Sequence, residues 1–191
     1  MISPTFDDLA RAQRVCCSFT DEPVPDELVE WMLDLASRAP RLGDDGPWVF
    51  VVVRDLAVRA ELSVSAPEVA GAPVHVVVGV DTALVARGRA AAAFPAIQNL
   101  LLAAGAAGYG AALTTTPLPN EVALAVGFPP TVHAVAVVGL GRSVESLDPA
   151  ARQPFEASTH RDRYGSAWDT GASTRMLRPY QGPIGDRRLT A

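Results

Sequence analysis

The sequence predicts a fold in which a central β-sheet is covered by helices on both faces. Three near-continuous apolar, β-branched runs of strand length indicate the sheet, at residues 48–55, 73–81 and 133–141. Runs of this kind, without polar alternation, are typical of strands buried on both sides. Segments with helical periodicity indicate the covering layers. At 191 residues and 49% hydrophobic content, the chain is long enough for one ordinary domain with a real core.

The first elements along the chain are predicted to be helices. Residues 6–14 suggest a short helix, and residues 25–39 suggest a second one. Pro25 and Asp26 are start signals for the second helix, and Pro40 stops it. Its apolar face is formed by residues at helical spacing, Leu28, Met32, Leu35 and Ala36.

A long helix is predicted between the second and third apolar runs. Residues 87–110 are rich in alanine and leucine and end in glycines that suit a helix C-terminus. Pro95 either kinks this helix or marks its effective start. Residues 111–116 then form a short β-type run, and residues 119–128 a short helix with Asn120 as its possible cap.

The character of the chain changes from Asp148 onward. This part is rich in arginine, glycine and proline and has no sustained periodicity. One interpretation is a disordered tail. The other is an arm that docks on another subunit through three aromatic residues, Phe155, Tyr164 and Trp168.

Composition excludes several classes of function. All 16 basic residues are arginine, so lysine Schiff bases and lysine general bases are impossible. The net charge of −5 argues against a nucleic-acid-binding face.

Cys16 and Cys17 are adjacent and poorly placed for a disulfide, which predicts a reducing compartment. Both are best interpreted as small buried apolar residues. With no apolar run of spanning length, we expect a cytoplasmic protein without membrane contact.

The local motifs carry little function on their own. The glycine clusters at 105–110 and 139–143 lack the strand, turn and helix order of a dinucleotide fingerprint. His75, His133 and His160 are far apart, and no Cys/His pair has metal-ligand spacing, so no metal site is predicted. His75 and His133 are expected to be strand-edge residues.

Four segments in a fixed order are more specific than any one motif. They read RVCCSFTDEPVPDELVEWMLDLASRAP (14–40), RLGDDGPWVFVVVRD (41–55), AAFPAIQNLLLAAGAAGYGAALTTT (92–116) and RQPFEASTHRDRYG (152–165). Together they resemble the FMN-dependent nitroreductase family over nearly the whole chain. The counterparts there are an RRSxRxF opening, an SxxNxQPW loop, a core helix with a Gln-Asn pair, and a C-terminal arginine and proline with an HRDRxG-like ending.

The resemblance implies an α+β sandwich, with a mixed central sheet flanked by helices, in an intertwined homodimer with an exchanged C-terminal arm. Residues 1–150 would be the core, and residues 151–191 an extended arm of the same domain. In this family NAD(P)H reduces FMN, and the electrons then pass to a nitro compound, a quinone or a similar acceptor in a ping-pong cycle. No catalytic acid or base is assigned, because the protein mainly positions the cofactor.

The resemblance also implies the binding residues. The phosphate of FMN would be held by the opening and by the C-terminal arginine, at Arg14, Val15, Cys17 and Arg152. The ring and ribityl chain would be lined by the loop before Pro47 and by the threonine loop, at Asp44, Gly46, Leu113 and Thr114.

The sequence departs from the family at several of these positions. Gln13 replaces the first arginine, Val15 the serine and Cys17 the last basic residue, and each lost phosphate contact removes on the order of 1.5–3 kcal/mol. Asp44 and Gly46 stand where the family has an asparagine and a glutamine. Further arginines could compensate, namely Arg11, Arg87, Arg89, Arg161 and Arg163. Two hypotheses therefore stay open, a working FMN oxidoreductase and a flavin-free binding or scaffold subunit.

Overall fold

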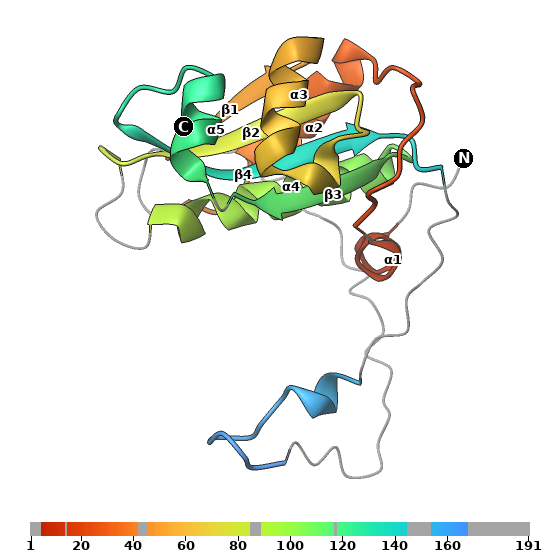
Figure 1. Cartoon of the computed structure of the whole chain (residues 1–191). Coiled ribbons are helices and arrows are strands. Elements are labelled where there is room, and N and C mark those ends of the chain that lie inside the picture. The colour runs from red at the N-terminus through yellow and green to blue at the C-terminus, as the bar shows by residue number, and fades with distance from the viewer. Residues whose placement is uncertain are drawn as a thin grey trace, which may run out of the picture. The chain divides into compact units, whose positions relative to one another are not determined.

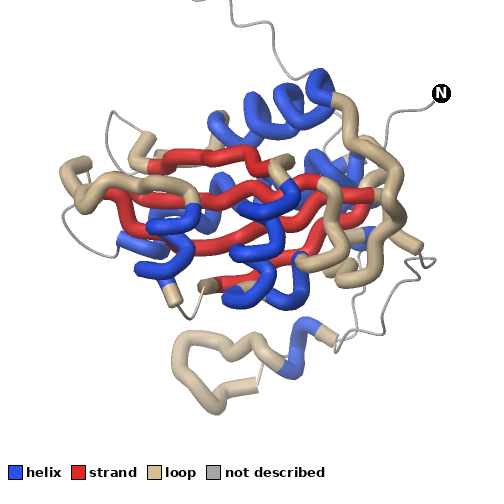
Figure 2. The backbone as a smooth tube through the Cα atoms, turned by 45° about the horizontal axis from the view of Figure 1, so that its top comes forward, coloured by secondary structure: helices blue, strands red, loops and turns tan. Residues whose placement is uncertain are grey.

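The computed structural model describes residues 5–13, 15–41, 46–84, 89–116, 118–144 and 154–167. The chain divides into two compact units, residues 1–150 and residues 151–191. The larger unit is a sheet with helices packed on both sides (Figures 1 and 2). Its strands are β1 (Trp48–Val53), β2 (Val74–Asp81), β3 (Gly110–Thr115) and β4 (Val132–Gly141). Its α-helices are α1 (Phe6–Ala12), α2 (Asp26–Ser37), α3 (Leu56–Ser65), α4 (Phe94–Ala106) and α5 (Pro119–Ala125).

The sheet has the strand order β1-β2-β4-β3, and all of its neighbouring strands are antiparallel. This corrects the expected mixed sheet for the described part of the chain, where parallel pairing is limited to one isolated bridge between Val15 and Ala111. The near-continuous hydrophobicity of the strands reflects cover on both faces and not parallel pairing. Strand β2 is central and buried from Val74 to Val80.

Two apolar layers cover the sheet, as predicted. On one face, α2 and α4 pack through residues that include Met32, Ile97 and Leu100. On the other face, α3, α5 and the short 3-10 helix η1 (Pro67–Val69) pack around Leu62 and Val122. The α+β arrangement that the sequence predicted is therefore confirmed, with the core divided between the two sides of the sheet.

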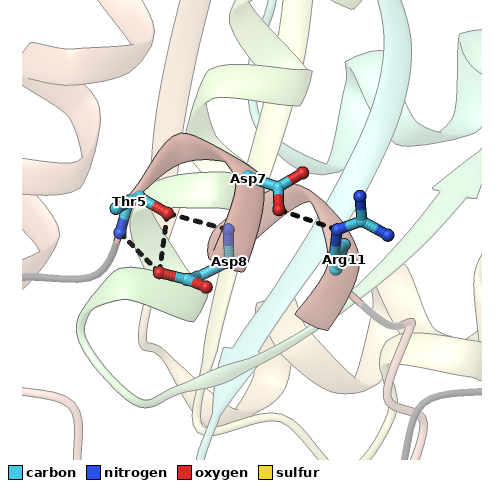
Figure 3. A network of polar contacts seen from close by, with 4 residues as sticks. All are labelled: Thr5, Asp7, Asp8 and Arg11. Atoms are coloured by element: carbon cyan, nitrogen blue, oxygen red, sulfur yellow. Dashed lines mark hydrogen bonds and ion pairs between the residues drawn. The ribbon is translucent and has the colours of Figure 1, made fainter. Parts of the chain in front are cut away.

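Local signals explain where most helices begin. Thr5 and Asp8 form a capping box at the start of α1, and Asp7 pairs with Arg11 one turn later (Figure 3). Pro95 lies in the first turn of α4, so it marks the helix start and does not kink it. This start follows η2 (Arg89–Ala93), a 3-10 segment at the beginning of the predicted long helix.

Two helix predictions need correction. Asn120 does not cap α5, because the helix begins at Pro119 and its N-cap is Leu118. Helix α3 was not predicted at all. Asp55 caps it, and its carboxylate accepts hydrogen bonds from the backbone N–H groups of Ala57 and Val58 at 2.9 and 3.0 Å.

His75 is not a strand-edge residue, as the sequence suggested, but lies fully buried on β2. Its Nε2 is 2.8 Å from the carbonyl oxygen of Val69 in η1, while its Nδ1 has no partner. Burial lowers the pKa of His75 to about 4, against the opposing effect of the Val69 hydrogen bond, and nearby Arg59 lowers it further. His75 is therefore neutral at pH 7. His133, by contrast, is exposed near the start of β4.

The described part of the smaller unit contains η3 (Phe155–Ala157) and a bridge between His160 and Ala167. The rings of His160 and Tyr164 meet edge to face with centroids 4.6 Å apart, and Tyr164 is 95% exposed. Residues 154–167 thus contain local structure. Trp168 lies outside the described residues. Across the described ranges of both units, no helix is long and apolar enough to cross a membrane.

Candidate functional site

The predicted phosphate-binding opening runs along the outer edge of β3. Val15 pairs with Ala111, and the backbone N–H of Cys16 donates to the carbonyl oxygen of Ala111 at 2.9 Å. This pairing gives the segment an alternating pattern, with Val15 and Cys17 exposed and Cys16 buried. The prediction that both cysteines are buried is therefore correct for Cys16 and wrong for Cys17. Arg14 lies outside the described residues.

A cavity of about 380 Å³ adjoins this opening. Leu9 and Ala12 of α1 line it, together with Leu101 and Leu102 of α4. The remaining walls come from Gln13, Gly105, residues 108–111, and Arg142 and Ser143 after β4. The volume lies within the usual range of small-molecule sites.

Glycines leave part of the cavity wall without side chains. Nothing lies within 4 Å of the position that a Cβ would take at Gly105 or Gly108. Gly108 also has a φ of 77°, in the left-handed region that favours glycine. A ligand could therefore approach the backbone closely after α4.

Among the described residues that line this cavity, Arg142 is the charged one. Its Nε donates to the Glu22 carboxylate at 2.7 Å, and its guanidinium carbon lies 4.7 Å from the centroid of the Tyr109 ring. The hydrogen bond and charge of Glu22 raise the pKa of Arg142 above its ordinary value, so Arg142 stays cationic at every physiological pH. The two contacts hold the guanidinium from two directions.

The side chains of Gln13 and Gln98 hydrogen-bond to each other beside the cavity. The amide of Gln98 donates to the side-chain oxygen of Gln13 at 2.8 Å, and a longer contact of 3.5 Å runs in the opposite direction. The neighbouring Asn99 donates its amide to the carbonyl oxygen of Leu35 in α2 at 3.1 Å. The Gln-Asn pair, which the resemblance matches to the family's core helix, thus makes contacts inside this chain, between α4 and the segments that pack on it.

The predicted ring-binding loop lies at the other edge of the sheet. Gly46 precedes β1, and a Cβ there would be 3.2 Å from the Trp48 ring and 3.5 Å from the Arg41 side chain. The carbonyl oxygen of buried Pro47 accepts a hydrogen bond from the N–H of Asp81 at 2.7 Å, which fixes the entry to β1. Asp44 lies outside the described residues.

The threonine loop faces both sides of the sheet. The side chain of Leu113 packs on the layer of α2 and α4. The hydroxyl of Thr114 donates to the Glu68 carboxylate at 2.6 Å, and this hydrogen bond lowers the pKa of Glu68. A second cavity of about 510 Å³ lies here, lined by Leu113, Thr114 and Glu68 among others. The hydroxyl proton of Thr114 is therefore engaged inside the chain.

The predicted site residues that the structure describes do not line one common cavity. Val15 and Cys17 lie beside Ala111 at one end of β3, and Leu113 and Thr114 follow along the same strand. Gly46 lies just before β1, and β1 is three positions from β3 in the sheet order. At roughly 4.8 Å between neighbouring strands, β1 and β3 are about 14 Å apart. Arg152 lies outside the described residues.

Sequence reasoning missed three residues of these cavities, Arg142, Tyr109 and Glu68. Arg142 had a signal, because it follows the glycine-rich end of a predicted strand, where ligand contacts are common. Of the compensating arginines considered, Arg11 pairs with Asp7 on α1 and does not line the cavity. Among the described residues, no group of three or more His, Cys, Asp or Glu side chains is arranged to hold a metal ion.

Comparisons with known proteins agree on one family. The model of the nitroreductase family matches residues 10–70. A protein from Methanothermobacter thermautotrophicus, named as an NADH dehydrogenase/NAD(P)H nitroreductase, is 31% identical over 155 residues, covering 76% of this chain and 80% of that protein.

Solved structures show the same fold. A protein from Bacteroides thetaiotaomicron, named as an NADH dehydrogenase/NAD(P)H nitroreductase, is 25% identical with a TM-score of 0.76, over 82% of this chain and 96% of that one. An FMN-dependent nitroreductase from Clostridium difficile is 18% identical with a TM-score of 0.74, over 82% of this chain and 98% of that one. The second likeness bears on the fold alone.

Proposed function

This chain belongs to the nitroreductase family, and on that premise we propose that it is an FMN-dependent NAD(P)H oxidoreductase that reduces nitro, quinone or similar acceptors. The observation that carries the proposal is the cavity beside the opening segment. It joins apolar walls, a glycine-lined backbone and one fixed cation, Arg142, next to the position of the family's phosphate motif. These features fit the phosphate and ribityl end of a flavin nucleotide.

The residues of this chain would bind and orient the cofactor. Val15 joins the opening to β3 through its pairing with Ala111, a residue that lines the cavity. The Thr114 hydroxyl oxygen can still accept a hydrogen bond, since the hydroxyl donates its hydrogen bond to Glu68. When bound, the flavin supplies the hydride and electron transfer between a nicotinamide donor and the acceptor, in a ping-pong cycle.

We also propose a homodimer in which each site is completed by both subunits, with residues 151–191 exchanged as an arm. The predicted ring loop and phosphate segment lie at opposite edges of one sheet, which a second copy could bring together. Exposed large apolar residues on α1, α2 and α4 support an interface there, namely Phe6, Trp31 and Phe94.

Charge supports the exchange of the arm. Residues 1–150 contain nine arginines and 17 acidic residues, for a net charge of −8, whereas residues 151–191 contain seven arginines and four acidic residues, for +3. Exposed Phe155 and Tyr164 would add apolar contacts to this attraction.

A flavin-free binding or scaffold role is the second candidate. It is favoured by the uncharged residues of the opening, where Val15 and Cys17 are exposed and Gln13 is engaged with Gln98. In that role, the apolar residues and Arg142 that line the cavity would bind a different ligand.

The visible absorption spectrum of the purified protein separates these candidates. It is recorded as purified, then after incubation with excess FMN and desalting, and finally under anaerobic NADH or NADPH. We expect retained flavin bands that bleach with a nicotinamide. Retained flavin that does not bleach would indicate another electron donor. A protein that retains no flavin after loading would refute the oxidoreductase and leave the binding or scaffold role.

A further inference from the structure

Arg142 lies near Gln13, a position of the opening segment where the family's positive charge is missing. It lines the same cavity as Gln13, the residue that stands in place of the family's first motif arginine. The other cavity residues on α1 and α4 are apolar or glycine. Among the described residues that line the cavity, the guanidinium available to a bound anion is therefore that of Arg142.

Two neighbouring side chains, Glu22 and Tyr109, fix the position of the Arg142 guanidinium. Tyr109, which is only 5% exposed, supports its face, and Glu22 accepts from Nε. Within the described residues, the Nη1 and Nη2 groups of Arg142 make no hydrogen bond. Because a guanidinium has five N–H donors in a rigid fork, the two Nη groups remain available to a second anion.

Arg142 has an acidic partner, Glu22, and none of the described residues that line the cavity is acidic. Glu22 accepts from Nε and is not among the described residues that line the cavity. Side chains of Arg142 and Glu22 are 46% and 50% exposed, and a pair with such exposure contributes little to folding. A binding role explains this arrangement better than a stabilising one.

We propose that Arg142 binds the phosphate of FMN and replaces the basic residues missing at positions 13 and 17. This inference rests on the proposed function, since it assigns a residue to the same flavin. Glu22 acts as a positioning residue that holds the Nε edge of the guanidinium.

Paired titrations with FMN and riboflavin test this assignment, because the two flavins differ by the phosphate alone. We expect wild type to prefer FMN, and Arg142→Ala to lose roughly 10- to 100-fold in FMN affinity with riboflavin affinity unchanged. Arg142→Lys keeps a charge and should retain part of the FMN preference. Glu22→Gln keeps an acceptor for Nε but removes the negative charge that competes with the phosphate, so it should tighten FMN binding.

Arg38→Ala is the matched control, since Arg38 is also exposed and paired with a carboxylate, Asp34, but follows the end of α2 and does not line this cavity. It should leave both affinities unchanged. Equal losses for FMN and riboflavin in Arg142→Ala, or no loss in either, would overturn the assignment while leaving the flavin function intact. Failure of wild type to bind either flavin would instead overturn the proposed function and this inference with it.

Discussion

Acid should destabilise this protein through His75 before its carboxylates titrate. In the folded chain His75 is buried, and burial lowers its pKa to about 4, whereas its pKa in the unfolded chain is the ordinary 6.5. Between pH 6.5 and pH 4, His75 is therefore mostly protonated in the unfolded chain and mostly neutral in the folded chain. The free energy of unfolding is highest above pH 6.5 and falls as the pH drops toward 4.

The size of this loss follows from the two pKa values. One pH unit between them corresponds to about 1.4 kcal/mol, so the full loss is roughly 3.4 kcal/mol once the pH is below 4, and about 2 kcal/mol is already lost at pH 5. A loss of 2 kcal/mol is a large fraction of the stability of an ordinary domain.

Denaturant unfolding at pH 8 and pH 5 measures the effect. His75→Gln is the informative variant, because its amide can still donate to Val69 but does not titrate. His133→Gln is the matched control, since His133 is an exposed histidine on the neighbouring strand β4. We expect His75→Gln to lose about 2 kcal/mol less than wild type between the two pH values. Identical pH dependence in wild type and His75→Gln would refute the reasoning.

Three further changes test the site and the fold. Arg152→Ala should strongly reduce the ratio of flavin to protein absorbance after purification, and an unchanged ratio would show that Arg152 does not hold the phosphate. Cys17→Arg should tighten FMN binding in a fluorescence titration by restoring a positive charge, whereas an unaltered dissociation constant would mean that position 17 faces away from the phosphate. Asp55→Ala should lower the free energy of unfolding by about 1 kcal/mol, because the N–H groups of Ala57 and Val58 lose their acceptor, while Asp55→Asn should cost much less.

The fold was predictable where its signals are local. The apolar runs of β1, β2 and β4, the periodic face of α2 and the alanine- and leucine-rich composition of α4 each lie within a short window of sequence. Helix α3 was missed although Asp55 is a typical cap, because the short segment behind it has a single fully buried large residue, Leu62. The buried position of His75 also could not be predicted, since a strand residue does not reveal which segment covers it.

The candidate site was less predictable because its contacts join distant parts of the chain. Thr114 and Glu68 are 46 residues apart, and Arg142 and Glu22 are 120 apart. Resemblance assigned Val15 to the phosphate-binding opening, but it could not show that Gln13 would bond to Gln98. Nor could it show that an arginine after β4 would reach the same cavity.

The arrangement of the two cysteines gives the protein a built-in attachment point for a probe. Cys16 is 4% exposed and its thiol donates to the carbonyl oxygen of Ser18, whereas Cys17 is exposed. A thiol-specific fluorophore would therefore react selectively at Cys17, and the absence of lysine leaves no side-chain amine to compete for it. The label would lie two residues from Val15, beside the proposed phosphate site, and could report ligand entry without any engineered cysteine.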